Sequence, residues 1–174
     1  MNNLGSSLAN ILAAAFIFTA GLSPAAAQER PQADLAKSLV GTWRLVSYTA
    51  LDQITKDVSY PQGKRPIGYL QYSPGGHMVV FQSSGEISNA QPPFTDAQKV
   101  AFYDALVAYC GTYTIQGNTV THHVIAAYRP DWVGSGQVRY VELHGNSLTI
   151  RTAPLILVAT GRKVVVTLNW EREE

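Results

Sequence analysis

Two adjacent histidines, His122 and His123, are the side chains best suited to acid–base or metal chemistry. They lie in a segment rich in β-branched residues, Thr119–Ala126, which predicts a strand. Neighbouring residues of a strand point to opposite faces, so the two imidazoles cannot bind one metal ion together. His122 shares its face with Val120 and Val124, and we therefore expect it to point into the protein.

An inward imidazole such as His122 has three possible roles. It can act as a general base, it can bind a haem iron, or it can hydrogen-bond to a ligand or a neighbouring side chain. Spacing identifies no nucleophile or acid partner, and the four histidines and one cysteine form no HxH, HxxxH or CxxC pattern. We therefore expect the hydrogen-bonding role, with no catalytic residue, no metal site and no cofactor.

Arg139 is the second polar candidate, because it shares a strand face with Val141 and Leu143. A guanidinium on an apolar inner face needs a partner, since burying an unpaired charge is costly. Its planar fork matches a ligand carboxylate. A salt bridge at the rim of the fold is the alternative.

Aromatic side chains on the predicted strands complete the candidate site. A tyrosine combines an apolar ring with one hydrogen-bonding tip, which suits the wall of a ligand cavity, although plain core packing is the alternative for each. Trp132 lies in the loop 128–136 and is predicted to cover the mouth. The predicted ligand-binding residues are Tyr69, Phe81, Tyr113, His122, Arg139 and Trp132.

The elements that must position these residues are almost all strands. Short Gly-containing turns such as Gly117-Asn118 and Gly145-Asn146 join several of them as hairpins. Local connections and the absence of βαβ alternation predict an all-β, eight-stranded (at most nine) antiparallel up-and-down barrel, because closure removes the sheet edges. The predicted strands are Leu39–Leu51, Ile67–Tyr72, His77–Gln82, Thr112–Gln116, Thr119–Ala126, Gln137–His144, Ser147–Thr152, Leu155–Ala159 and Lys163–Trp170.

One helix is predicted to interrupt the strands, over Asp96–Tyr109. Thr95 and Gln98 have the spacing of a capping box, and apolar residues follow at helical intervals. We expect one face of this helix to lie on the barrel. The only cysteine, Cys110, comes at its apolar end, which predicts a buried thiol and allows no intramolecular disulfide.

The segments LVGTWRLVSY, IGYLQYSPGGHM, THHV, DWVG, QVRYVELHG and LNWER occur in this order. Through them the chain resembles the bacterial and fungal lipocalin-like domain family, from Leu39 to Arg172. The resemblance implies a calycin-type β-barrel that binds a small molecule, and it implies no particular reaction. A second lipocalin motif, the usual disulfides and the helix after the last strand are absent from the sequence.

The resemblance also implies a structural role for both ends of the barrel sequence. Gly41 and Trp43 match the Gly-x-Trp motif of the first lipocalin strand, and Arg172 matches the arginine near the end of the last strand. In lipocalins this arginine packs across the tryptophan. We expect the same cation–π contact here, sealing the closed end of the barrel.

The first 27 residues contain no charged side chain, and Ile11–Leu22 is an apolar run of twelve residues. Ala25-Ala26-Ala27 follows as a small-residue cleavage pattern. We predict a signal peptide over residues 1–27, a polar leader over 28–38, and a barrel domain over 39–174 of an exported protein, periplasmic or secreted. The run is shorter than the roughly 20 residues of a membrane span, and an uncleaved N-terminal anchor is the alternative.

The charge balance argues against one class of partner. The formal net charge is +1 and no basic block occurs, so nucleic-acid binding is not predicted. We expect an exported protein that binds a small, mainly hydrophobic ligand in its barrel. The alternatives are an isomerase or cyclase with His122 as base, and a filled barrel that serves as an envelope scaffold. No oligomeric state is predicted.

Overall fold

The computed structural model describes residues 34–87, 90–157 and 160–173. A helix, α2 (Asp96–Ala105), and a 3₁₀ turn, Pro130–Trp132, accompany the strands. The strands are β1 (Gly41–Asp52), β2 (Val58–Ser59), β3 (Pro66–Tyr72), β4 (His77–Ser84), β5 (Val107–Gln116), β6 (Thr119–Ala127), β7 (Gly136–His144), β8 (Ser147–Thr152), β9 (Leu155–Leu157) and β10 (Arg162–Arg172).

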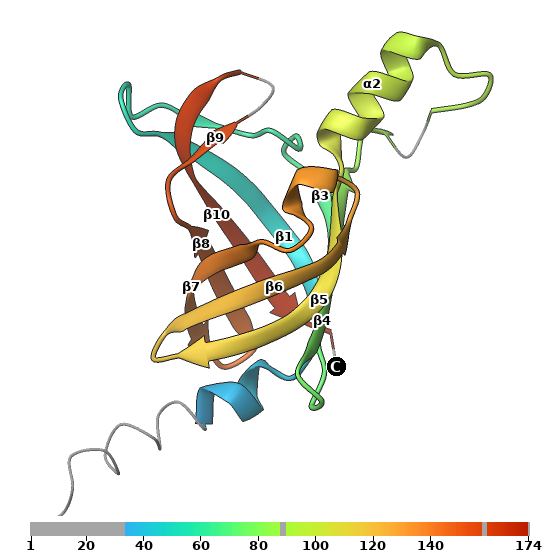
Figure 1. Ribbon diagram of the computed structural model, residues 1–174. Coiled ribbons are helices and arrows are strands. Elements are labelled where there is room, and N and C mark those ends of the chain that lie inside the picture. Colours follow the sequence, from blue (N-terminus) through green and yellow to red (C-terminus); the bar gives the residue numbers. More distant parts are fainter. Residues whose placement is uncertain (1–33, 88–89, 158–159, 174) are drawn as a thin grey trace, which may run out of the picture.

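Eight of these strands close into an antiparallel barrel in the order β1-β3-β4-β5-β6-β7-β8-β10 (Figure 1). The barrel closes where β10 pairs with β1, from Trp43↔Arg172 to Asp52↔Val164. The short strands β2 and β9 pair with β1 and β10 outside this ring. The predicted up-and-down barrel is confirmed, and β2 is a strand that the sequence pattern did not indicate.

The inner face of β1 does not follow a simple alternation. Trp43 and Leu45 are buried, and a β-bulge between Leu45 and Ser47 then places Tyr48 on the same inner face. Val46, in contrast, is 45% exposed. Simple alternation along the predicted strand Leu39–Leu51 would place Tyr48 opposite to Trp43; this is wrong, because the extra residue of the bulge shifts the alternation by one.

Helix α2 begins where the capping box predicted, with Thr95 accepting a hydrogen bond from the backbone of Gln98. It ends at Ala105, however, and none of its residues is buried. The helix projects beyond the open end of the barrel (Figure 1), so the prediction that one face lies on the barrel is wrong.

The chain after α2 is a strand because it pairs with β4. The pairs run from Gln82↔Val107 to Val79↔Cys110 and beyond, so sheet hydrogen bonds extend through a segment that was predicted as helix. Cys110 is therefore a partly buried strand residue, not the last residue of a helix. This extension of β5 brings Tyr109 into the barrel wall, where it is buried.

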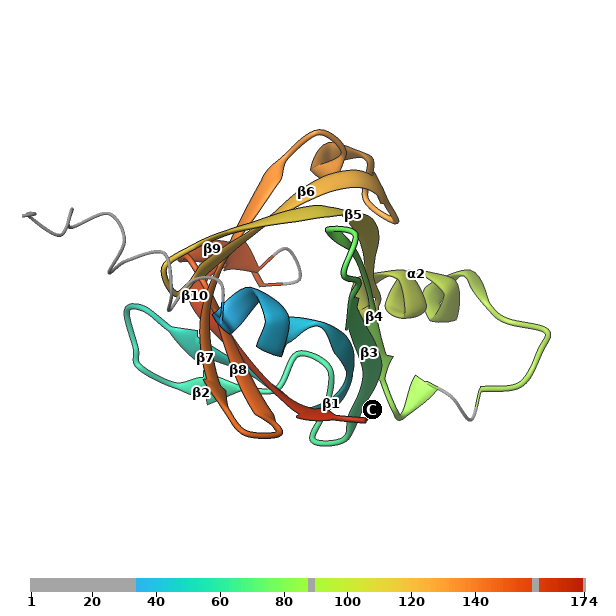
Figure 2. The ribbon, with the colours of Figure 1, turned by 90° about the horizontal axis from the view of Figure 1, so that it is seen from below.

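The opposite end of the barrel is closed by a short helical segment, residues 34–39, which lies across it (Figure 2). Trp43 is completely buried, and its indole Nε1 donates a hydrogen bond to the Leu39 carbonyl at 2.9 Å. The Arg172 guanidinium carbon lies 4.1 Å from the centre of the Trp43 ring. Arg172 also donates hydrogen bonds to the carbonyls of Val40 and Ser38. The structure thus contains the expected cation–π contact.

The predicted signal peptide, residues 1–27, and the first part of the predicted leader lie outside the described residues. Within the described ranges, no helix has both the length and the apolar character needed to cross a membrane.

Candidate ligand-binding site

The barrel surrounds a cavity of about 950 Å³ whose mouth lies beside the last residues of α2. Inward side chains of the barrel strands make most of its wall apolar. This volume is in the range of small-molecule sites, roughly 300–1,000 Å³. A filled-barrel scaffold would have a packed lumen, so a cavity of this size favours ligand binding over that alternative. The apolar wall includes Leu70, Val80, Val107, Ile150, Val166 and Leu168.

His122 lies in the cavity wall and is 2% exposed, so its expected inward orientation is confirmed. Its two ring nitrogens each meet a tyrosine hydroxyl, Nε2 with Tyr72 at 2.7 Å and Nδ1 with Tyr109 at 2.8 Å. Burial, and then the nearby charge of Arg139, lowers the pKa of His122 well below its usual value. The imidazole is therefore neutral at physiological pH.

The hydrogen bonds of this triad assign its proton positions. Tyr72 is buried, and within the described part of the chain its hydroxyl bonds only to His122. A buried hydroxyl hydrogen without an acceptor is costly, so Tyr72 donates to Nε2. A neutral imidazole then carries its proton on Nδ1 and donates it to Tyr109. The hydroxyl hydrogen of Tyr109 remains free to donate into the cavity.

Both nitrogens of His122 are thus occupied within the protein. A haem iron or a metal ion would have to displace a tyrosine hydroxyl to reach either nitrogen, so the site does not fit a haem bound through His122. His123, on the other face of β6, meets the Thr114 hydroxyl at 2.9 Å. The described residues contain no cluster of three or more metal-ligating side chains.

Arg139 also lines the cavity, on β7. Its guanidinium donates to the Val138 carbonyl at 2.9 Å and makes two longer hydrogen bonds of 3.4 Å, to the Tyr109 hydroxyl and to Gln137 Oε1. The salt bridges formed by the described residues do not include Arg139. The salt bridge at the barrel rim, which the sequence suggested as an alternative role for Arg139, is therefore not observed among the described residues.

Three buried polar atoms in the cavity wall have no hydrogen-bond partner among the described residues: Oε1 of Gln62, Oε1 of Gln82 and Nε1 of Trp170. Each side chain is at most 5% exposed. An unsatisfied buried polar group costs about 1–3 kcal/mol, so its presence calls for an explanation. Each of these three atoms is itself covered by protein, so a ligand in the cavity would contact it only after neighbouring side chains move.

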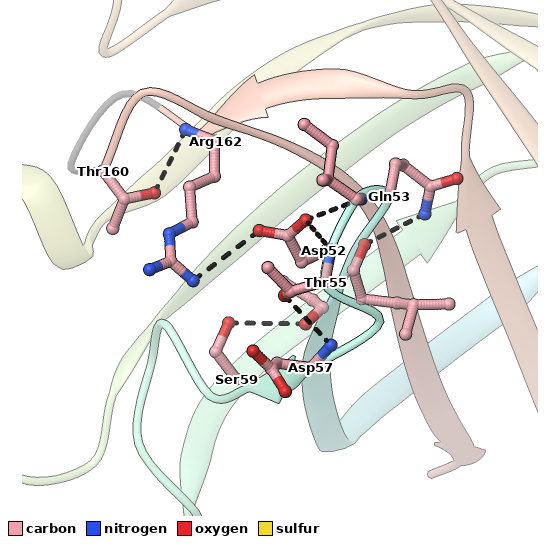
Figure 3. Close-up of polar contacts among 10 residues, drawn as sticks. Asp52, Gln53, Thr55, Asp57, Ser59, Thr160 and Arg162 are labelled. Atoms are coloured by element: carbon pink, nitrogen blue, oxygen red, sulfur yellow. Dashed lines mark hydrogen bonds and ion pairs between the residues drawn. The ribbon is translucent and has the colours of Figure 1, made fainter.

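A group of polar contacts links the end of β1 to the start of β10, close to Ser59 and Thr160, which line the cavity (Figure 3). The Asp52 carboxylate accepts hydrogen bonds from the backbone of Ile54 and Thr55, at 2.7 and 3.0 Å, and meets Arg162 at 3.6 Å. The two backbone donors, more than Arg162, hold the pKa of Asp52 below its usual value. Ser59, which lines the cavity, donates to the Ala50 carbonyl at 3.3 Å.

A profile of the lipocalin-like domain matches residues 40–173, which is most of the chain. The chain belongs to the lipocalin-like domain family. No curated protein sequence matches it significantly. In this lipocalin-like barrel, the contact between Trp43 and Arg172 closes one end, and the cavity opens at the other.

The lipocalin-like cavity contains only part of the predicted residue set. His122, Arg139 and Trp132 line it. The Trp132 ring packs edge-on against Tyr109, with ring centres 5.6 Å apart, so Trp132 belongs to the wall near the mouth.

Tyr69 and Phe81 were expected to line the cavity, and this placement is wrong. They form a cross-strand pair on the outer face of β3 and β4 and are 50% and 53% exposed. Tyr113 is partly buried and donates to the Ser73 carbonyl at 3.1 Å, outside the cavity lining. Both faces of β3 carry large apolar residues, so composition did not distinguish inside from outside.

Sequence reasoning also missed several wall residues: Tyr48, Gln62, Gln82, Tyr109 and Trp170. Simple alternation along β1 puts Tyr48 on the wrong face because of the bulge, and Tyr109 falls within the segment that the sequence predicts as a helix. Alternation along β4 and β10 provides a signal for Gln82 and Trp170, whereas Gln62 lies in the turn between β2 and β3, where no such pattern exists. Gln82 follows the buried Met78 and Val80 at intervals of two, and Trp170 follows Val166 and Leu168 in the same way.

Proposed function

We propose that this lipocalin-like protein binds a small, mainly apolar molecule in its barrel cavity. The observation that carries the proposal is a cavity of about 950 Å³ whose mainly apolar wall also contains a few polar side chains, among them Tyr109 and Arg139. Ligand sites have this composition, because apolar contacts give affinity and a few polar groups fix the orientation.

Filling the cavity should abolish this binding. Val107 lines the cavity, whereas the next residue, Ala108, pairs with the outward Phe81 and therefore points to the outer face. We expect Val107→Trp to weaken binding of the neutral apolar dye N-phenyl-1-naphthylamine at least about tenfold, since the new indole occupies ligand volume. Ala108→Trp should keep the wild-type affinity. Fluorescence titration measures both, and circular dichroism confirms that each variant is folded.

Two results would contradict the cavity as binding site. One is a folded wild-type chain that does not take up the dye at all. The other is equal loss of affinity in Val107→Trp and Ala108→Trp, which would place the bound dye on the surface.

An isomerase or cyclase is the second candidate, and one observation favours it. The cavity wall gathers groups with shifted pKa values: burial raises the pKa of Tyr48 to about 12 and lowers that of His122. Burial is the main cause of both shifts, however, and both nitrogens of His122 are already hydrogen-bonded. Binding is therefore the better-supported function, and recovery of a bound natural ligand in chemically altered form would favour the enzyme.

Export of the protein is also part of the proposal, based on the uncharged apolar segment 1–27. We expect expression of the full chain in a bacterial host to give a protein that begins at Gln28. Intact-mass measurement of the extracytoplasmic fraction checks this result. A protein that retains residues 1–27 in the membrane fraction would instead support an uncleaved anchor.

A further inference from the structure

Among the described residues that line the cavity, one cationic group has no carboxylate partner. Four charged side chains line it: Asp104, Arg129, Asp131 and Arg139. Arg129 and Asp131 pair at 2.6 Å, and Asp104 is an exposed residue of α2 at the mouth. Arg139 forms no salt bridge with any described residue, and its contacts are to neutral oxygens. The wall of the cavity therefore has positive character around Arg139.

Hydrogen-bond donors converge at the same point. A guanidinium has five N–H groups, and three hydrogen bonds of Arg139 are formed within the described chain. Tyr109 accepts from both His122 and Arg139, so the hydrogen of its own hydroxyl is left to donate to a ligand. His122 is neutral and adds no acceptor. The corner formed by Arg139 and Tyr109 thus offers donors and one positive charge.

We infer that the ligand bears a carboxylate, which binds between the guanidinium of Arg139 and the hydroxyl of Tyr109. This inference rests on the proposed function and names the chemical class of the ligand. The remainder of the molecule lies along the apolar wall that includes Leu70, Val80 and Ile150. Charge-assisted hydrogen bonds are about twice as strong as neutral ones, and the guanidinium fork suits a carboxylate, so a neutral head group gains much less here.

The test compares two probes that differ only in the head group, cis-parinaric acid and its methyl ester. Fluorescence titration of the folded chain gives an affinity for each. We expect the acid to bind at least about tenfold more tightly than the ester, because hydrogen bonds to a charged group are stronger than those to a neutral one. The acid-to-ester preference should fall to about one in Arg139→Gln and decrease in Tyr109→Phe. The matched control is Arg151→Gln, on the outer face of β8, where Arg151 pairs with Glu142 at 2.6 Å.

The outcomes separate this inference from the proposed function. A preference for the acid that disappears in Arg139→Gln and persists in Arg151→Gln supports the carboxylate site. Equal binding of acid and ester by the wild-type chain overturns the inference but leaves cavity binding intact. A preference for the acid that survives in Arg139→Gln also overturns it. Binding of neither probe, nor of the neutral dye, contradicts the proposed function itself.

Discussion

Replacement of Trp43 by alanine is expected to lower the free energy of unfolding by about 3–5 kcal/mol, the range for large aromatic-to-alanine changes in a core. Trp43 is completely buried, and its indole donates to the Leu39 carbonyl at 2.9 Å. Its ring also supports the guanidinium of Arg172, which lies 4.1 Å from the ring centre. One substitution therefore opens a void, removes a hydrogen bond and releases the last strand at the closed end.

Urea unfolding followed by circular dichroism measures this effect. Trp43→Phe provides a variant that stays folded if the alanine variant does not, and we expect it to lose a smaller part of the stability because it retains an aromatic face for Arg172. The matched control is Val100→Ala on α2, where the side chain is 60% exposed and the expected change is within about 0.5 kcal/mol. A Trp43→Ala variant that loses less than about 1 kcal/mol would show that this end of the barrel does not depend on the tryptophan.

The barrel was predictable because several local signals agree. Gly117 and Gly145 each adopt a positive φ, as the first residue of a tight hairpin turn requires, and both pairs of flanking strands were located from these turns. Alternation placed His122 correctly, since Val120 and Val124 on the same face are buried with it. These signals depend on two to six neighbouring residues and can be read without knowledge of the tertiary structure.

The candidate site was less predictable, because its residues depend on long-range pairing. The bulge in β1 reverses the orientation of Tyr48, and only the pairing with β10 reveals it. In the segment before Cys110, the spacing of apolar residues fits both a helix and a strand. Hydrogen bonding to β4 makes this segment a strand. Tyr69 and Phe81 show that aromatic character indicates a strand but does not identify its inner face.

Acid is expected to destabilise the fold through His122 before the carboxyl groups titrate. Burial lowers the pKa of His122 in the folded state well below its unfolded value of about 6.5. The unfolded chain therefore binds more protons in the interval between these two values. In that interval stability rises with pH, and it is lost as the pH falls below about 6.5, by up to about 1.4 kcal/mol per pH unit. Above about pH 6.5 this contribution is complete and constant.

Urea unfolding at a series of pH values tests this dependence. His122→Gln should reduce the slope between about pH 6.5 and pH 5, whereas His123→Gln, on the outer face of β6, should retain it. The carboxyl group of Asp52 has a lowered pKa, so the stability that it contributes is lost only at lower pH, below its unfolded value of about 3.9.

Imidazole nitrogen NMR of the folded wild-type chain measures the protonation state and the tautomer of His122 independently. The hydrogen bonds to Tyr72 and Tyr109 predict that His122 keeps its proton on Nδ1, and stays neutral, at pH values where exposed imidazoles are protonated. A His122 that becomes charged near pH 6.5 in the folded protein would remove the cause of the acid effect. The same spectra identify the tautomer: a proton on Nε2 would make Tyr109 the donor to Nδ1 and would remove the basis for assigning its hydroxyl as a donor to the ligand. This measurement therefore tests the stability of the barrel and the polarity of its cavity together.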